Sequence, residues 1–196
     1  MDPDAHAHGH DDHQHEIPEG GAALTGMAVS ATLHCLTGCA IGEVAGMAIG
    51  SGFGLPNATT VVLSVVLAFF FGYLLTSLPL LRAGMALAAV VPIALASDTL
   101  SIATMEVVDN LIMLVVPGAI DAMLGDILFW GSLSFALAVA FVFTVPVNRW
   151  LLARGKGHAA VHATGIHGGP PTRVVGGVVI AMAVFGTTVL VAEAIG

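Results

Sequence analysis

The chain of 196 residues alternates between long apolar runs and short polar or turn-forming segments. Five apolar runs lie at about residues 21–50, 59–78, 83–116, 127–147 and 173–195. Each run is long enough to cross a bilayer, because roughly 20 apolar residues span the hydrocarbon core. The pattern therefore predicts an all-α fold, a polytopic membrane helix bundle of about five transmembrane helices that forms a single domain over residues 21–196.

The third run is too long for one straight crossing, and it contains Pro92. Proline removes a helical hydrogen bond and its ring clashes with the preceding turn, while Ser97-Asp98 could begin a new segment as an N-cap. We therefore expect a third helix that is kinked or broken near its middle. If this run crossed twice instead of once, the later spans would reverse their direction.

Composition supports the membrane assignment. Hydrophobic residues make up 57% of the chain and charged residues only 9%, whereas soluble domains carry about one quarter charged residues. Residues 1–20 differ from the rest, since they hold six acids, no base and five histidines, namely His6, His8, His10, His13 and His15. Such a segment cannot bury an apolar core, so we expect a disordered tail that gathers metal ions weakly. A merely solvated tail or an expression tag are the alternatives.

The few basic residues indicate the orientation of the chain. All five lie at the ends of runs or in one loop: Arg82, Arg149, Arg154, Lys156 and Arg173. With five crossings these residues share one side with the N-terminus, and the positive-inside rule makes that side cytoplasmic. The loop of residues 149–173 also carries His158, His162 and His167. The two histidine-rich segments should therefore meet on the cytoplasmic face and gather metal there.

The segment HCLTGCAIGE, residues 34–43, places ionisable side chains in the middle of the first apolar run. On a helix, Cys35, Cys39 and Glu43 follow one another at every fourth position and share one stripe, with His34 beside it. Charged groups at this depth cost several kcal/mol unless they face a protein interior, a cavity or a bound ion. We therefore expect this stripe to be a functional site within the membrane.

Glycines recur at every fourth position on the neighbouring flank of the same run, at Gly38, Gly42, Gly46 and Gly50. Small residues at this spacing let two membrane helices approach closely. The run is thus predicted to pack with one flank and to present ligands with the next. The simpler alternative is that Cys35 and Cys39 are only small packing residues beside the glycines.

Three carboxylates lie within twelve residues of the third run, at Asp98, Glu106 and Asp109. Asp98, Met105, Asp109 and Met113 share one helical sector of less than about 90°, with Glu106 at its border. This sector cannot face lipid, so we expect it to face the stripe of the first run. Plainer explanations exist: Asp98 could cap a helix, the methionines could fill the core, and the other two acids with Asn110 could lie at the membrane surface.

No base within a span can pair with these acids, so they must be protonated or bind a cation. Thiols and thioethers favour Cu(I) and Zn(II), imidazole accepts both ions, and carboxylates can complete the coordination. We therefore expect a Cu(I) or Zn(II) ion at a site drawn from His34, Cys35, Cys39, Glu43, Met105, Glu106 and Asp109. Asp98, Asn110 and Asp121 form a secondary polar set.

Five segments together resemble an uncharacterised family of small prokaryotic membrane proteins catalogued as a domain of unknown function. They are HCLTGCAIGE, TMEVVDN with the preceding Ser97-Asp98, the turn of Pro117-Gly118 with Asp121, FWGSL, and PVNRWLLARGKGH. The resemblance covers about Met27 to His158 and brings no known activity. It implies a protein of the prokaryotic inner (cytoplasmic) membrane in which one site contains His34, Cys35, Cys39, Glu43, Asp98, Glu106, Asp109, Asn110 and Asp121.

These observations favour a membrane protein that binds or moves a soft transition-metal ion supplied by the cytoplasmic histidines. A protein without enzymatic activity is expected more than an enzyme. Two alternatives stay open: a thiol-redox or haem-associated membrane protein, and a structural subunit of a larger membrane complex or homo-oligomer. The missing CxxC and CxxCH patterns count against the first. A net charge of -8 and the lack of a Gly-Lys-Ser/Thr loop give no support to nucleic-acid binding or to a phosphate-binding loop. The lipid bilayer is the expected partner.

Overall fold

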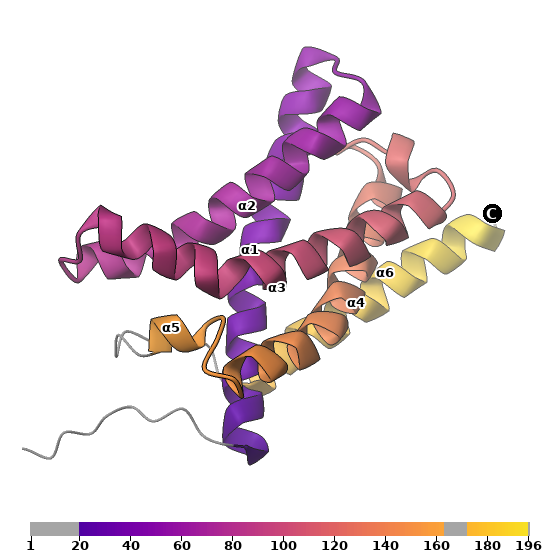
Figure 1. Ribbon diagram of the computed structural model, residues 1–196. Helices are drawn as coiled ribbons and strands as arrows, with labels where there is room; N and C mark the ends of the chain where they lie inside the picture. The colour runs from indigo at the N-terminus through magenta and orange to yellow at the C-terminus, as the bar shows by residue number, and fades with distance from the viewer. Residues whose placement is uncertain (1–19, 163–171, 196) are drawn as a thin grey trace, which may run out of the picture.

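The computed structural model describes residues 20–162 and 172–195, and every regular element within these ranges is a helix (Figure 1). The elements are α1 (Gly21–Phe53), α2 (Asn57–Arg82), α3 (Leu87–Val115), the short 3-10 helix η1 (Ala119–Asp121), α4 (Ile127–Leu152), α5 (Ala159–His162) and α6 (Thr172–Ile195). Five of them, α1, α2, α3, α4 and α6, are long and apolar enough to cross a membrane. The prediction of a polytopic all-α bundle with about five spans is confirmed.

Most of the histidines that were predicted to gather metal fall outside the described residues. These are His6, His8, His10, His13 and His15 of the N-terminal tail, and His167 of the second histidine-rich segment. His162 is the last residue of α5. The gathering of metal by these side chains therefore stays a prediction.

The third apolar run forms one continuous helix, α3, which begins after Ala86 and passes through Pro92. Pro92 is the sixth residue of the helix, so the hydrogen bond that it cannot donate to the Ala88 carbonyl is lost near the helix start, and the helix continues past it. Ser97 and Asp98 lie inside α3 and start no new segment, since the Ser97 hydroxyl donates to the carbonyl of Ala94 at 3.1 Å. The expected break at this point is absent, and the run supplies one candidate span.

The glycine ladder of α1 packs against α2. Turn by turn, Gly38 meets Gly72, Gly42 meets Ala68, Gly46 meets Ser64 and Gly50 meets Thr60. A Cβ atom added to Gly38 would lie 2.6 Å from the Gly72 Cα, so the two backbones approach too closely for any larger side chain. This contact confirms the predicted packing flank. The adjacent flank of α1, with Cys35 and Cys39, faces α3.

The crossing helices form a bundle with two distinct ends (Figure 1). The start of α1, the α2–α3 turn, the end of α4 and α5 lie at one end, which we call the α5 end. The α1–α2 turn, η1 and the C-terminal end of α6 lie at the other, the η1 end. Arg82 ends α2 and Arg149 lies in the last turn of α4, so basic residues gather at the α5 end.

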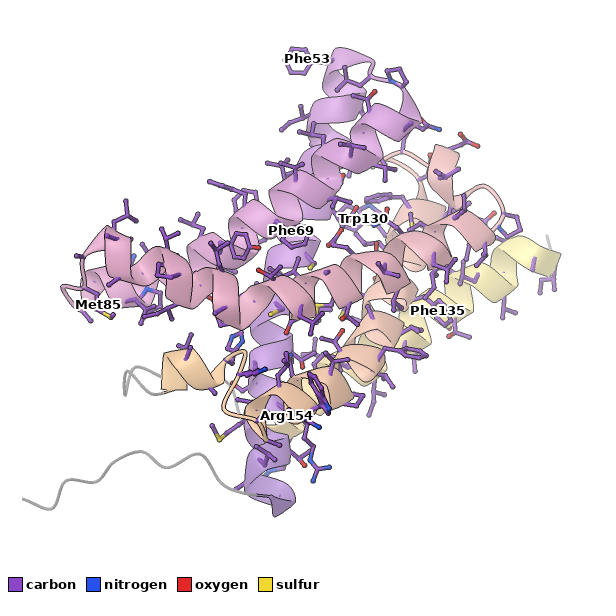
Figure 2. All side chains as sticks on the ribbon, viewed as in Figure 1. Phe53, Phe69, Met85, Trp130, Phe135 and Arg154 are labelled. Carbon is purple, nitrogen blue, oxygen red and sulfur yellow. The ribbon has the colours of Figure 1, made fainter. Side chains whose placement is uncertain are left out.

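Large apolar side chains cover the outer faces of the bundle (Figure 2). Phe53 is 81% exposed at the η1 end, and Val107 of α3 and Ile180 of α6 are similarly exposed. In water such a surface would be unfavourable, whereas in a bilayer it meets lipid. The exposed apolar faces and the buried polar groups described below are the arrangement expected of a membrane protein.

Candidate metal centre

Side chains from three segments that are far apart in the sequence meet in the interior. Cys35 of α1, Asp98 of α3 and His158 of the α4–α5 connection are all buried, and their ligand atoms lie within 4.8 Å of one another. His158 Nδ1 lies 3.3 Å from Asp98 Oδ1. A thiol, a carboxylate and an imidazole are the usual protein ligands of transition-metal ions. We call this group the Cys35 centre.

Two glycines bring His158 to the Cys35 centre. After α4 ends at Leu152, Gly155 and Gly157 adopt φ angles of 65° and 61°, a left-handed conformation that favours glycine. A Cβ atom on Gly157 would also lie 3.1 Å from the side chain of Leu151. The chain therefore reverses over the end of α4 and returns to place His158 beside α1 and α3.

His34 lies next to the Cys35 centre, outside its closest group of ligand atoms. Its ring meets the His158 ring edge to face, with ring centroids 5.6 Å apart. Its Nε2 atom shares a hydrogen bond of 2.8 Å with the Thr76 hydroxyl of α2. This bond fixes the orientation of the His34 ring, which could join the ligands of a bound ion.

Uncharged side chains form a hydrogen-bonded network that joins three helices beside the Cys35 centre. Asn148 of α4 is 1% exposed, and its Nδ2 atom donates to the Thr32 hydroxyl of α1 at 2.8 Å. Its Oδ1 atom accepts a hydrogen bond from Ser101 of α3. Thr32 and Ser101 each lie one helical turn from Cys35 and Asp98 respectively, so the network sets the spacing of the helices that carry the ligands.

Replacing Asn148 by alanine is expected to lower the free energy of unfolding by roughly 0.5–2 kcal/mol, because hydrogen bonds between membrane helices contribute about this much. Denaturant unfolding of the purified protein in detergent measures the change. Thr188→Ala is the matched control, since the Thr188 hydroxyl is exposed and donates to the Val184 carbonyl of its own helix at 2.8 Å. Equal stability losses in the two variants would contradict the structural role of the network.

The geometry of the Cys35 centre fits a divalent metal ion. Ligand atoms around a tetrahedral zinc ion lie about 3.5 Å apart, so separations of up to 4.8 Å need to contract by no more than roughly 1.3 Å to hold one. Three protein ligands leave a coordination position open, as in zinc sites that exchange a ligand. A thiolate and a carboxylate together carry two negative charges, which balance a divalent ion in a buried, low-dielectric place.

A second group of ionisable side chains lies between α1 and α3, further toward the η1 end. It consists of Cys39 and Glu43 of α1 with Met105, Glu106 and Asp109 of α3, and we call it the Asp109 cluster. The sulfur atoms of Cys39 and Met105 lie 4.0 Å apart. Glu43 interacts electrostatically with both Glu106 and Asp109. These three carboxylates and the Cys39 thiol thus lie near one another between α1 and α3, although no three of their ligand atoms come within 4.8 Å as they do in the Cys35 centre.

The carboxylates of the Asp109 cluster have few hydrogen-bond partners. Asp109 is 2% exposed, and among the described residues neither of its oxygens has a partner. Among the described residues, Glu43 and Glu106 each also have one carboxylate oxygen without a hydrogen-bond partner. The other Glu106 oxygen accepts a hydrogen bond from Asn110 at 3.4 Å. Buried carboxylates without partners are costly, so this cluster is suited to a cation.

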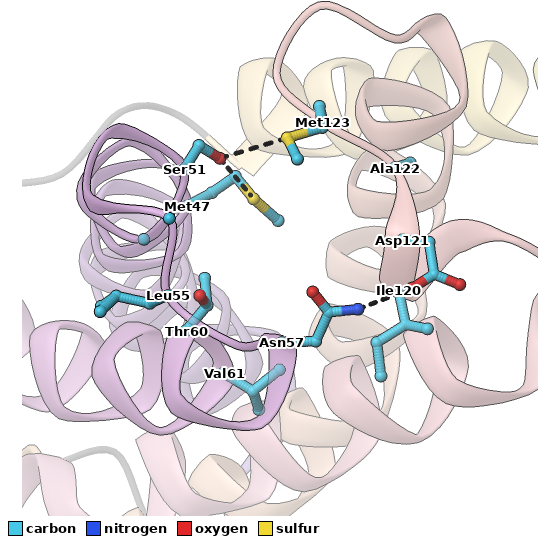
Figure 3. A pocket seen from close by; sticks show the side chains of 12 residues that line it. Met47, Ser51, Leu55, Asn57, Thr60, Val61, Ile120, Asp121, Ala122 and Met123 are labelled. Atoms are coloured by element: carbon cyan, nitrogen blue, oxygen red, sulfur yellow. Dashed lines mark hydrogen bonds between the residues drawn. The ribbon is translucent and has the colours of Figure 1, made fainter.

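Asp121 lies at the η1 end, apart from both groups. It is exposed, and its carboxylate accepts a hydrogen bond of 2.6 Å from Asn57 at a pocket between the α1–α2 turn and η1 (Figure 3). In the same pocket the Ser51 hydroxyl lies 3.5 Å from the sulfur atoms of both Met47 and Met123. The structure therefore does not bring Asp121 to the site that the resemblance implied.

The structure divides the other predicted residues between two groups. Cys35 lies with Asp98, a member of the predicted secondary polar set, and Cys39 lies with Met105. The sequence predicts His158 to lie in the metal-gathering loop, whereas in the structure it is a buried member of the Cys35 centre. Both cysteines are free thiols in different surroundings. This separation counts against the alternative in which the two thiols cycle as a redox pair.

Thr76 and Asn148 support the Cys35 centre and were not predicted. A pattern in the sequence could have identified Thr76 as a buried residue. Small or hydroxyl residues recur at every fourth position of α2, at Thr60, Ser64, Ala68, Gly72 and Thr76. This stripe mirrors the glycine ladder of α1. Asn148 follows Thr144 by one turn, and polar residues one turn apart inside an apolar run mark an internal face.

A membrane helix bundle with a buried thiol, carboxylate and imidazole defines the class of this protein. Within that class, the chain belongs to the family described as "Domain of unknown function (DUF4396)", whose match covers residues 26–157. The match includes most of α1 and all of α2 to α4, and it ends just before His158. No curated protein and no solved structure matches the chain.

Proposed function

We propose that the protein binds a transition-metal ion at the Cys35 centre and moves it through the membrane. The observation that carries this proposal is the meeting of Cys35, Asp98 and His158, all buried, with ligand atoms within 4.8 Å. The five basic residues lie at helix ends or in the loop after α4, so none supplies the missing positive charge. A metal ion with two positive charges balances the thiolate and the carboxylate.

Of the two ions expected from the sequence, the ligand set supports Zn(II) more strongly than Cu(I). Cu(I) favours sulfur ligands, and the Cys35 centre offers one sulfur atom, since Met105 lies against Cys39. Zn(II) accepts sulfur, nitrogen and oxygen in one site, and it would leave the group without net charge. A Cu(I) ion at the same ligands would leave one negative charge buried.

We further propose that the α5 end is cytoplasmic and that ions enter from it. The basic residues Arg82 and Arg149 support this orientation. The tail histidines together with His162 and His167 would gather ions on that side, and neutral imidazoles exchange such ions readily. His158 is the histidine that hands the ion to the buried ligands. The membrane in question would be the inner membrane of a prokaryote.

Metal analysis of the purified protein under reducing conditions tests the proposal. We expect Cys35→Ser and His158→Ala each to lower the metal content by one ion per chain after loading with Zn(II), because each removes one of three ligands. In cells, the same changes should alter tolerance to zinc.

The matched control is Glu193→Gln, which removes an exposed carboxylate on α6 and should leave the metal content unchanged. A wild-type protein that binds no metal, or Cys35→Ser and His158→Ala variants that bind as much as the wild type, would overturn the proposed function.

A further inference from the structure

The three carboxylates of the Asp109 cluster take no part in the Cys35 centre. We propose that this cluster is a second binding site for a divalent transition-metal ion, so that two sites lie in series between α1 and α3. This inference rests on the proposed function, because it supplies the next position for an ion that leaves the Cys35 centre. It also assigns a role to Cys39, the second thiol of the chain.

The two sites follow one another along the same pair of helices. Cys39 lies one helical turn, about 6 Å, beyond Cys35 on α1, and Glu43 lies one turn further. Both α1 and α3 run from the α5 end toward the η1 end. An ion that passes from Asp98 to Asp109 therefore moves across the bundle without leaving the interface between these helices.

The ligands of the Asp109 cluster differ from those of the Cys35 centre and lie further apart. Among the described residues, only Cys35, Asp98 and His158 bring three such ligand atoms within 4.8 Å of one another, so the Asp109 cluster must contract more around an ion. Asp109 is buried without a hydrogen-bond partner among the described residues, and it interacts with Glu43 and Glu106. The Cys39 thiol and the Met105 thioether lie 4.0 Å apart beside these acids. Carboxylates with one sulfur ligand bind divalent ions of the zinc class, and the chain offers no basic side chain at this depth.

A continuation exists beyond the Asp109 cluster. Met47 lies one turn past Glu43 on α1 and lines the pocket at the η1 end, where Ser51 and Met123 also meet (Figure 3). Thioether and hydroxyl groups can accompany an ion to the surface without trapping it. Met47 thus places a thioether between the Asp109 cluster and the pocket at the η1 end.

Cobalt titration of the full-length protein in detergent tests this inference. Co(II) reports sulfur ligation through its thiolate absorption, and each proposed site contains one cysteine. We expect two thiolate-ligated cobalt ions per chain, which their absorption distinguishes from cobalt held by the tail histidines. The double variant Glu106→Gln/Asp109→Asn should bind one ion and keep the thiolate absorption of Cys35, whereas Asp98→Asn should lose the ion of the Cys35 centre. Glu193→Gln should still bind two.

Retention of the first ion in the double variant also shows that it is folded, and Glu43→Gln provides a second, independent change to the same site. A wild-type protein that binds one cobalt ion, lost in Asp98→Asn, would overturn the second site and leave the proposed function intact. A wild-type protein that binds no cobalt would overturn both. Two ions that survive both changes to the Asp109 cluster would place the second ion elsewhere and contradict the inference.

Discussion

Replacing Gly42 by valine is expected to abolish the native packing of α1 against α2 and to lower the free energy of unfolding by more than about 3 kcal/mol. A Cβ atom at this position would lie 2.7 Å from the backbone carbonyl carbon of Leu67, and it would also collide with the backbone of Ala68. Backbone cannot move aside as a flexible side chain does, so the two helices must separate. Size-exclusion profiles and thermal unfolding in detergent measure the loss.

Gly52→Val is the matched control for this change. It makes the same substitution in the same helix, but no atom lies within 4 Å of the added Cβ, and Gly52 is exposed near the end of α1. We expect this variant to purify and unfold like the wild type. Similar losses in both variants would show that valine harms α1 generally, and would contradict the importance of the close helix contact.

Removal of bound metal is expected to destabilise the protein by about 4 kcal/mol for each ion, when the loaded protein is compared at a metal concentration one thousandfold above the dissociation constant. The cause is mass action, since the buried ligands come together only in the folded chain. Thermal unfolding with Zn(II) and with excess chelator measures the difference. The Asp98→Asn variant should lose the stabilisation that zinc at the Cys35 centre gives to the wild type.

Glu193→Gln replaces an exposed carboxylate on α6, so zinc should stabilise this variant as much as it stabilises the wild type. In excess chelator, the metal-free Asp98→Asn variant and the metal-free wild type should unfold at similar temperatures, because the change preserves the shape of the side chain. An Asp98→Asn variant that zinc stabilises as strongly as the wild type would rule out Asp98 as a ligand.

The helices and the division of α1 into two flanks could be predicted because they depend on local periodicity. Apolar runs of sufficient length predict the spans, and spacing of four residues places Gly38 and Gly42 on one flank and Cys35 and Cys39 on the next. The structure bears out both patterns. Whether α3 breaks at Ser97-Asp98 could not be settled from the sequence, because a polar pair inside an apolar run can cap a helix or face a partner.

The grouping of the ligands depends on tertiary contacts that periodicity does not encode. His158 looks like one of several loop histidines, and only the turn formed by Gly155 and Gly157 returns it to the interior. Cys35 and Cys39 share a stripe in the sequence, but one turn of helix is enough to give each thiol its own partners from α3. A single predicted site therefore became two groups.

Metal-edge anomalous diffraction from zinc-loaded crystals is the sharpest test of the Cys35 centre, because it locates the ion itself. We expect an anomalous peak between the Cys35 Sγ atom, the Asp98 carboxylate and the His158 ring, and the loss of that peak in Asp98→Asn. A zinc-loaded protein with no peak at this position, or with peaks only at surface histidines, would contradict a metal ion at the Cys35 centre.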